Sequence, residues 1–206
     1  MRAAIWYFDF VSPFAYLCLH RLKELPADLA IEYRPVLFAG LLTHWGQKGP
    51  AELPAKRRYT YRWSHWWAKQ LGLPFRYPAG HPFNPLPYLR LALACECRPD
   101  AIRRIFESLW TTGGDAADPG RFAALLDELK KNEGDVERAR EQLRMNTDAA
   151  IARGVFGVPT FEVEGELFWG ADSIGFLKAF LADASTLRDE EMRRLDGLPV
   201  SAARKA

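Results

Sequence analysis

The stretch FDFVSPFAYL, residues 8–17, joins an apolar strand to a helix through Ser12-Pro13. The run AIWYFDF (4–10) is rich in aromatic side chains, which is typical of a β-strand. Serine before a first-turn proline is a common helix start. The helical stripe that follows consists of Phe14, Leu17, Cys18 and Leu22. Ser12 therefore either only caps this helix, or stands at the tip of an active site at the helix N-terminus.

The rest of the chain predicts two further strand regions separated by a helical block. LAIEYRPVLF (29–38) reads as a second strand, so residues 4–38 form a β-α-β unit with a parallel strand pair. From 39 to 153 only helices and loops are expected. VPTFEVEGELFW (158–169) then predicts a hairpin around Glu164-Gly165, followed by a last helix. The tail after about residue 183 is charged and polar, and we expect it to be frayed.

Composition excludes several classes of protein. The 206 residues are 49% hydrophobic and 26% charged, with a net charge of +2, which gives no electrostatic reason to expect nucleic acid or an anionic membrane as the main partner. No apolar run reaches the roughly 18 residues of a membrane span, and no signal peptide precedes the first strand, so a cytoplasmic protein is expected. Three cysteines argue against a disulfide framework, and the four histidines show no metal-ligand spacing, so no metal is expected.

The order and spacing of several motifs resemble a known family. The motifs are FDFVSPFAYL, GQKGPAELPAKRRY (46–59), HPFNPLPYLR (81–90), LWTTGGDAADP (109–119) and GVFGVPTFEVEGELFWGADSIGFL (154–177). Together they resemble the DsbA-like group that contains kappa-class glutathione transferases and 2-hydroxychromene-2-carboxylate isomerases. The resemblance implies an α/β thioredoxin-like fold with an inserted all-helical domain. Its expected limits are 1–38 and 154–206 for the thioredoxin-like domain, and 39–153 for the inserted domain.

The chemistry expected at the Ser12 corner is not dithiol exchange. Oxidoreductases of this fold carry C-x-x-C where this chain has Ser12-Pro13-Phe14-Ala15, and serine and alanine cannot form a disulfide. Cys18 belongs to the apolar helical stripe and is expected to be an inert core thiol. A hydroxyl beside free N–H groups at a helix N-terminus suits an anion. The resemblance implies that this anion is the thiolate of glutathione, with Ser12 donating a hydrogen bond to the sulfur.

Two C-terminal motifs complete the expected glutathione site. The resemblance implies that the Val158-Pro159 peptide bond is cis and that the main chain of Val158 binds the cysteinyl part of glutathione, whereas a simple turn is the alternative. Asp172-Ser173 begins the last helix. It is expected to be an N-cap, and the resemblance adds that it binds the γ-glutamyl group. The two interpretations of Asp172-Ser173 are compatible.

Two motifs of the inserted domain have open interpretations. In KRRYTYRWSHWW (56–67), the stripe Tyr59, Trp63, Trp66 and Trp67 is expected either to be core or, by the resemblance, to line partly an aromatic-accepting pocket. The resemblance also implies that Lys56 meets the glycyl carboxylate of glutathione or the carboxylate of the substrate. Asn84 is expected either to satisfy backbone groups from a buried position, or to lie near cofactor and substrate.

The resemblance implies a glutathione-dependent isomerase that converts 2-hydroxychromene-2-carboxylate to trans-o-hydroxybenzylidenepyruvate. The partner would be a small aromatic carboxylate, and the expected assembly is a homodimer. A kappa-class-like transferase acting on another electrophile is the alternative, because the same Ser12 corner serves both reactions. A non-catalytic, peptide-binding protein with a thioredoxin-like cleft is the more distant alternative.

Overall fold

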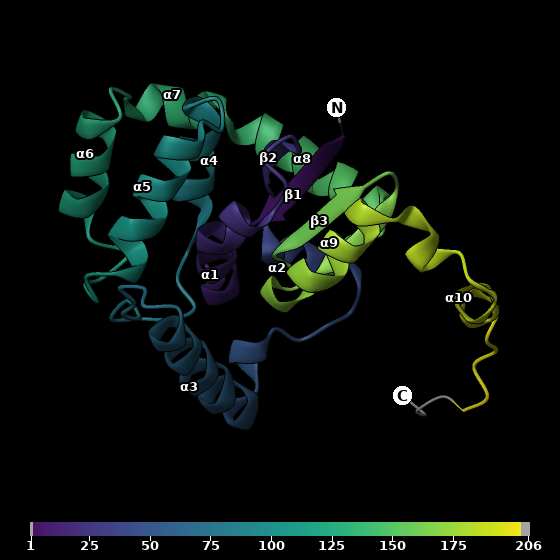
Figure 1. Ribbon diagram of the computed structural model, residues 1–206. Coiled ribbons are helices and arrows are strands. Elements are labelled where there is room, and N and C mark those ends of the chain that lie inside the picture. The colour runs from purple at the N-terminus through teal and green to yellow at the C-terminus, as the bar shows by residue number, and fades with distance from the viewer. Residues whose placement is uncertain (1, 203–206) are drawn as a thin grey trace.

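The computed structural model describes residues 2–202 and contains a four-stranded sheet in the order β2-β1-β3-β4 (Figure 1). The strands are β1 (Ala3–Phe8), β2 (Ala30–Pro35), β3 (Thr160–Val163) and β4 (Glu166–Trp169). The predicted parallel pairing of β1 with β2 is confirmed, and β3 runs antiparallel to β1. The predicted hairpin is also confirmed, since Glu164 and Gly165 adopt the positive φ angles of 53° and 88° that a tight two-residue turn requires.

Seven α-helices and one 3-10 helix (Pro50–Glu52) lie between β2 and β3 in the described chain, where the sequence predicts a helical block. The α-helices are α2 (Phe38–His44), α3 (Pro54–Gln70), α4 (Leu86–Ala94), α5 (Pro99–Trp110), α6 (Pro119–Glu128), α7 (Glu133–Arg138) and α8 (Arg140–Ala152). Figure 1 shows α4, α5, α6 and α7 gathered on one side of the sheet, with α3 extending away below them. The predicted strand at 29–38 is shorter than expected, because α2 already begins at Phe38.

Both faces of the sheet are covered, because successive strand residues point to opposite sides. Trp6 and Phe8 of β1 pack in the larger core with α1 (Pro13–Arg21) and α9 (Ile174–Ala182). Tyr7, between them, faces a smaller cluster that α2 and α8 complete with Leu41 and Ala150. The first and last predicted helices therefore cover the face opposite α2 and α8.

Aromatic side chains of the helical block attach it to the strand that precedes Ser12. Phe106 of α5 lies 4.5 Å from Phe10 and 5.8 Å from Phe8, ring centre to ring centre. Trp110 ends α5 and is completely buried. Such rings bury a large apolar area and hold specific orientations, so the helical block and the end of β1 form one core.

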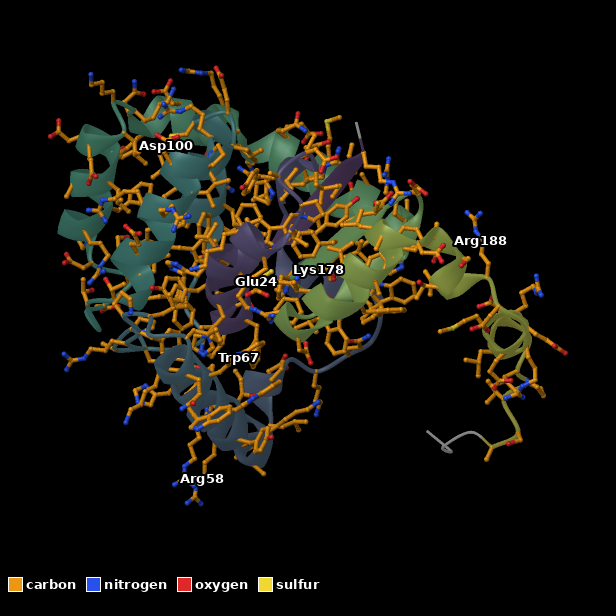
Figure 2. All side chains as sticks on the ribbon, in the orientation of Figure 1. Glu24, Arg58, Trp67, Asp100, Lys178 and Arg188 are labelled. Atoms are coloured by element: carbon orange, nitrogen blue, oxygen red, sulfur yellow. The ribbon has the colours of Figure 1, made fainter. Side chains whose placement is uncertain are left out.

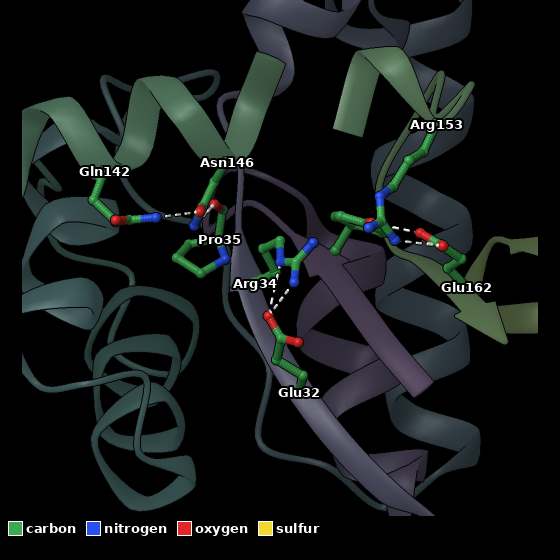
Figure 3. A network of polar contacts seen from close by, with 8 residues as sticks. Glu32, Arg34, Pro35, Gln142, Asn146, Arg153 and Glu162 are labelled. Atoms are coloured by element: carbon green, nitrogen blue, oxygen red, sulfur yellow. Dashed lines mark hydrogen bonds and ion pairs between the residues drawn. The ribbon is translucent and has the colours of Figure 1, made fainter. Parts of the chain in front are cut away.

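A polar network fastens α8 and the residue that follows it to the sheet (Figure 3). Glu162 accepts a 2.6 Å hydrogen bond from the Tyr7 hydroxyl and another of 2.6 Å from Arg153. The Asn146 side-chain amide donates to the carbonyl of Pro35 at 3.2 Å. Because Asn146 lies on α8 and Arg153 directly follows it, these bonds fix where the helical block returns to the sheet.

The C-terminal tail differs from the prediction of a frayed segment. A short helix, α10 (Glu190–Asp196), forms there and is capped by Asp189, whose side chain accepts the Met192 N–H at 2.8 Å. None of the α10 residues is buried, and the helix lies away from the body of the molecule (Figure 1). The capping residue Asp189 thus favours a helix in this segment, although the tail is polar in composition. Within residues 2–202, no helix is both long and apolar enough to cross a bilayer.

Candidate active site

Ser12 is the N-cap of α1, as the sequence predicts. Its backbone is extended (φ −88°, ψ 117°), Pro13 occupies the first helical position, and the Ser12 hydroxyl accepts the Ala15 N–H at 3.3 Å. The side chain is nearly buried, with 6% of the residue exposed. Capping alone leaves the hydroxyl proton of Ser12 free to donate to another acceptor.

The hydroxyl of Ser12 faces the main chain of Val158. Ser12 Oγ lies 3.5 Å from the Val158 carbonyl oxygen, which is the outer limit of a hydrogen bond. The predicted cis peptide bond between Val158 and Pro159 is confirmed. Two segments 146 residues apart in the chain therefore meet at the N-terminus of α1.

Two main-chain donors at this meeting point are unused. In residues 2–202, no acceptor receives the N–H of Phe14 or the N–H of Val158. The Phe14 N–H lies in the first turn of α1, where the helix dipole favours negative charge. A hydroxyl and a helical N–H suit a thiolate, and the open N–H and weakly bound C=O of Val158 suit an extended peptide. These donors and acceptors fit glutathione.

The Asp172-Ser173 turn lies beside Pro159, because the Gly170 N–H donates to the Pro159 carbonyl at 2.8 Å. Ser173 occupies the N-cap position of α9, as predicted, but no side chain makes a capping hydrogen bond there. Residues Ala171–Ser173 form a 3-10 turn that runs directly into α9, and the Ser173 hydroxyl donates to the Gly170 carbonyl at 2.8 Å. Asp172 is the exposed middle residue of this turn, so its carboxylate is open to a ligand.

The remaining two predicted site residues lie on the surface of the inserted block. Lys56 is exposed on the first turn of α3. Asn84 is exposed as well, which corrects the expectation that it is buried, although its side-chain oxygen does accept the Leu86 N–H at 3.1 Å. Among the described contacts, none joins Lys56 or Asn84 to Ser12. Their roles toward a ligand stay predictions.

The aromatic stripe of α3 is not core along its whole length. Tyr59 and Trp66 are 65% and 56% exposed, so the prediction that the stripe is buried is wrong for these two. The helix instead buries its small residues Thr60, Ser64 and Ala68.

The other two members of that stripe lie next to the Ser12 corner. The rings of Trp63 and Trp67 are stacked 5.7 Å apart, and Trp63 lies 4.9 Å from Phe14 of α1. Figure 2 shows Trp67 at the end of α3 that faces α1, whereas Arg58 points outward at the opposite end. A half-buried aromatic surface therefore lies two residues from Ser12.

Sequence reasoning missed a buried carboxylate beside the corner. Asp9 is completely buried, and its two oxygens accept the N–H groups of Val11 at 3.0 Å and Phe38 at 2.8 Å. Burial raises the pKa of Asp9 to about 7, against the opposing effect of these two donors. The sequence signal for this buried carboxylate is an acidic residue between two phenylalanines at the end of a strand.

His81 and Trp110 were missed as well. The His81 ring contacts the Val11 carbonyl and the Trp110 ring contacts the Phe10 carbonyl. Both partners are distant in sequence, so no local pattern indicates these contacts.

The thiol of Cys18, on α1, belongs to the core. Cys18 is completely buried, as predicted, and burial raises the pKa of its thiol. The part of the chain that the structure describes holds no group of three or more His, Cys, Asp or Glu side chains placed to bind a metal ion.

These features define a thioredoxin-like corner with serine in place of cysteine. The model of the DSBA-like thioredoxin domain matches residues 4–182, and the chain belongs to this family. The 2-hydroxychromene-2-carboxylate isomerase of Pseudomonas putida is 32% identical over 186 residues, which span 84% of this chain and 91% of that protein. Glutathione s-transferase kappa 2 of Caenorhabditis elegans is 24% identical, spanning 86% of this chain and 91% of its own.

A solved structure agrees with the sequence relatives. A crystallised 2-hydroxychromene-2-carboxylate isomerase superposes with a TM-score of 0.74 and 26% identity, covering 90% of this chain and 97% of that one. The chain is thus a homologue of these isomerases and of kappa-class glutathione transferases.

Proposed function

We propose that the protein binds glutathione at the Ser12 corner and catalyses the glutathione-dependent isomerisation of 2-hydroxychromene-2-carboxylate to trans-o-hydroxybenzylidenepyruvate. The observation that carries the proposal is the pairing of Ser12 with the main chain of Val158 at a helix N-terminus that has a free N–H. The homologous isomerases supply the choice of reaction.

Ser12 and Phe14 would lower the pKa of the bound thiol. A hydrogen bond to a charged partner contributes about 1.5–3 kcal/mol, and a helix N-terminus adds about 0.3–1 kcal/mol. Each pKa unit corresponds to about 1.4 kcal/mol, so the Ser12 hydroxyl and the α1 N-terminus together account for a depression of roughly one to three units. Bound glutathione then supplies a nucleophilic thiolate that is regenerated rather than consumed.

The other residues would orient the ligands. Val158 offers its main-chain N–H and C=O to the cysteinyl part of glutathione, and the Asp172-Ser173 turn faces the γ-glutamyl ammonium and carboxylate. The Phe14-Trp63 surface offers apolar rings to the bicyclic substrate, while Lys56 and Asn84 provide a cation and an amide for its polar groups. Orientation of this kind holds the substrate against the thiolate in the geometry that reacts.

The first experiment measures glutathione binding by calorimetry and thiolate absorbance against pH for wild type, Ser12→Ala and Ser108→Ala. Ser108 is the matched control, because it is similarly buried (7% exposed) and its hydroxyl bonds only the Ile105 carbonyl, at 3.0 Å. We expect a lowered thiol pKa in wild type and Ser108→Ala, and a return toward the free value in Ser12→Ala. Absence of glutathione binding to the wild-type protein would refute the proposal.

A kappa-class-like transferase reaction is the second candidate, and the kappa-class relatives favour it. Product analysis separates the two, because isomerisation leaves the glutathione concentration unchanged whereas conjugation consumes one glutathione per turnover. Chromene carboxylate that is converted without loss of glutathione supports the isomerase; a glutathione adduct as the product supports the transferase.

A further inference from the structure

The two peptide groups that precede Ser12 are each held from both sides. In the peptide between Phe10 and Val11, the carbonyl of Phe10 accepts the Trp110 ring N–H at 2.9 Å. The N–H of the same peptide group, on Val11, donates to the Asp9 carboxylate at 3.0 Å. Because a peptide group is planar, fixing its C=O and its N–H fixes the orientation of the whole plane.

The next peptide group, between Val11 and Ser12, is held in the same way. The carbonyl of Val11 contacts Nε2 of His81 at 2.8 Å, and the Ser12 N–H donates to the Asp9 carbonyl at 3.1 Å. This plane sets the direction in which the Cα–Cβ bond of Ser12 leaves the main chain. The position of the Ser12 hydroxyl therefore depends on the His81 ring.

The protonation state of His81 follows from its partners. A carbonyl only accepts, so Nε2 carries the proton that it donates to Val11. Burial lowers the pKa of His81, so the ring is neutral at neutral pH and its Nδ1 is an acceptor. The Tyr61 hydroxyl, on α3, lies 2.8 Å from Nδ1 and 2.7 Å from the His81 carbonyl oxygen, and its single proton is shared between these two acceptors. The donor to Val11 thus belongs to a chain that begins on α3.

The surroundings leave the His81 ring little freedom to turn. The rings of Tyr61, Tyr77 and Trp110 lie 5.2, 5.3 and 5.7 Å from it, ring centre to ring centre. Donors held in rigid, packed rings fix the direction of a hydrogen bond as well as satisfying the acceptor. A simple helix cap does not require such donors, because the Ser12 hydroxyl already bonds the Ala15 N–H.

We propose that His81 and Trp110 are positioning residues, which hold the two peptide planes before Ser12 so that its hydroxyl and the Phe14 N–H point at the sulfur of bound glutathione. The inference rests on the proposed function. It assigns to the helical block a part in thiolate stabilisation, since both rings come from that block, 70 and 100 residues from the carbonyls they bind. Donors fixed before the ligand arrives stabilise a charge without reorganisation.

His81→Gln and His81→Asn form a matched pair that tests this role. The glutamine nitrogen lies as many bonds from Cα as Nε2 of histidine, and can still donate to the Val11 carbonyl. The asparagine nitrogen lies one bond closer, at the place of Nδ1, and leaves that carbonyl without its donor. Calorimetry would give the dissociation constant of glutathione, absorbance against pH the thiol pKa, and thermal unfolding the stability of each variant.

We expect the two variants to differ in thiol pKa and not in ligand affinity. In His81→Asn the thiol pKa should rise by half a unit or more, which leaves about three-fold less thiolate at neutral pH, while His81→Gln stays near wild type. The dissociation constant should change by less than about three-fold in both, because Val158 and the Asp172-Ser173 turn are untouched.

Equal thiol pKa values in His81→Gln and His81→Asn would overturn the positioning role while leaving the proposed function intact. Failure of the wild-type protein to bind glutathione would overturn both. If the His81 variants do not fold, Trp110→Phe decides the question through the Phe10 carbonyl, because it removes one N–H donor and keeps an aromatic ring. The positioning role then requires the same rise in thiol pKa, and a wild-type value contradicts it.

Discussion

The buried carboxylate of Asp9 makes the stability of the fold depend on pH in a defined direction. Burial raises the pKa of Asp9 from its usual value of 3.8 to about 7 in the folded chain. The folded state therefore holds the proton more tightly than the unfolded state does. The contribution of this group to the free energy of unfolding is largest at low pH, and it is lost as the pH rises through about 7.

The magnitude follows from the slope between the two pKa values. In that range the folded chain binds one more proton than the unfolded chain, so stability falls by about 1.4 kcal/mol per pH unit. Above the folded pKa of about 7 this slope vanishes, so within the range from pH 5 to pH 8 it acts over only two pH units. The free energy of unfolding therefore falls by about 3 kcal/mol over that range.

Asp9→Asn removes the titrating group and provides the comparison. Urea unfolding of wild type and Asp9→Asn at pH 5, 6, 7 and 8 gives the difference in unfolding free energy, from which the titrations of all other groups cancel. We expect wild type minus variant to decrease by about 3 kcal/mol from pH 5 to pH 8. Asp28→Asn, at an exposed aspartate before β2, is the control for the loss of one carboxylate.

Two results would refute the reasoning. A difference that does not change between pH 5 and 8 would mean that Asp9 is ionised throughout in the folded protein. In that case the two N–H donors from Val11 and Phe38, the second of which begins α2, outweigh the cost of burial. A difference that increases with pH would contradict the predicted sign of the pH dependence.

Four further outcomes are expected. Tyr88→Phe should cost about 1–2 kcal/mol in urea unfolding, because the buried hydroxyl donates a 2.6 Å bond to a carbonyl in the loop before α6. Gly170→Ala should lower the free energy of unfolding by about 1–3 kcal/mol and weaken glutathione binding in calorimetry, since Gly170 has φ 98° and a Cβ there would strike the Asp172 carboxylate. Gly175→Ala is the control and should do neither, because a Cβ at Gly175 meets no atom within 4 Å. Cys18 should not react with a thiol reagent in the folded protein, and labelling followed by mass spectrometry would show modification of it only after denaturation. Sedimentation should give the mass of a homodimer, and a single-chain mass at micromolar concentration would contradict that expectation.

Features determined by neighbouring residues could be predicted from the sequence. Ser12-Pro13 starts a helix through bonds within one turn, and Glu164-Gly165 closes a hairpin through its own backbone angles. Ile102, Ile105, Phe106 and Leu109 are likewise spaced as one face of a helix in the sequence, and all four are buried on α5. In each case the pattern and the structure it produces lie within a few residues of each other.

Features determined by distant residues could not be predicted. The contacts of His81 with Val11 and of Trp110 with Phe10 depend on how the helical block packs against the sheet. A pattern within a short stretch of sequence carries no information about that packing. The same limit explains the error for Trp66: helical spacing identifies a common face, but the neighbouring elements decide which face is buried. On α3 they bury the face with the small residues Thr60, Ser64 and Ala68, where the Ser64 hydroxyl lies 2.8 Å from the Tyr77 hydroxyl.

The strand order has a consequence for synthesis on the ribosome. β1 lies in the middle of the sheet, yet it is made first, and its neighbour β3 is made about 150 residues later. At typical elongation rates of about 5–20 residues per second, one edge of an aromatic strand therefore stays unpaired for roughly 8 to 30 seconds. An unpaired edge of this kind readily joins other chains. We expect the nascent polypeptide to depend on chaperone protection until residue 163 has left the exit tunnel, and Ser12 to meet Val158 only at that late stage.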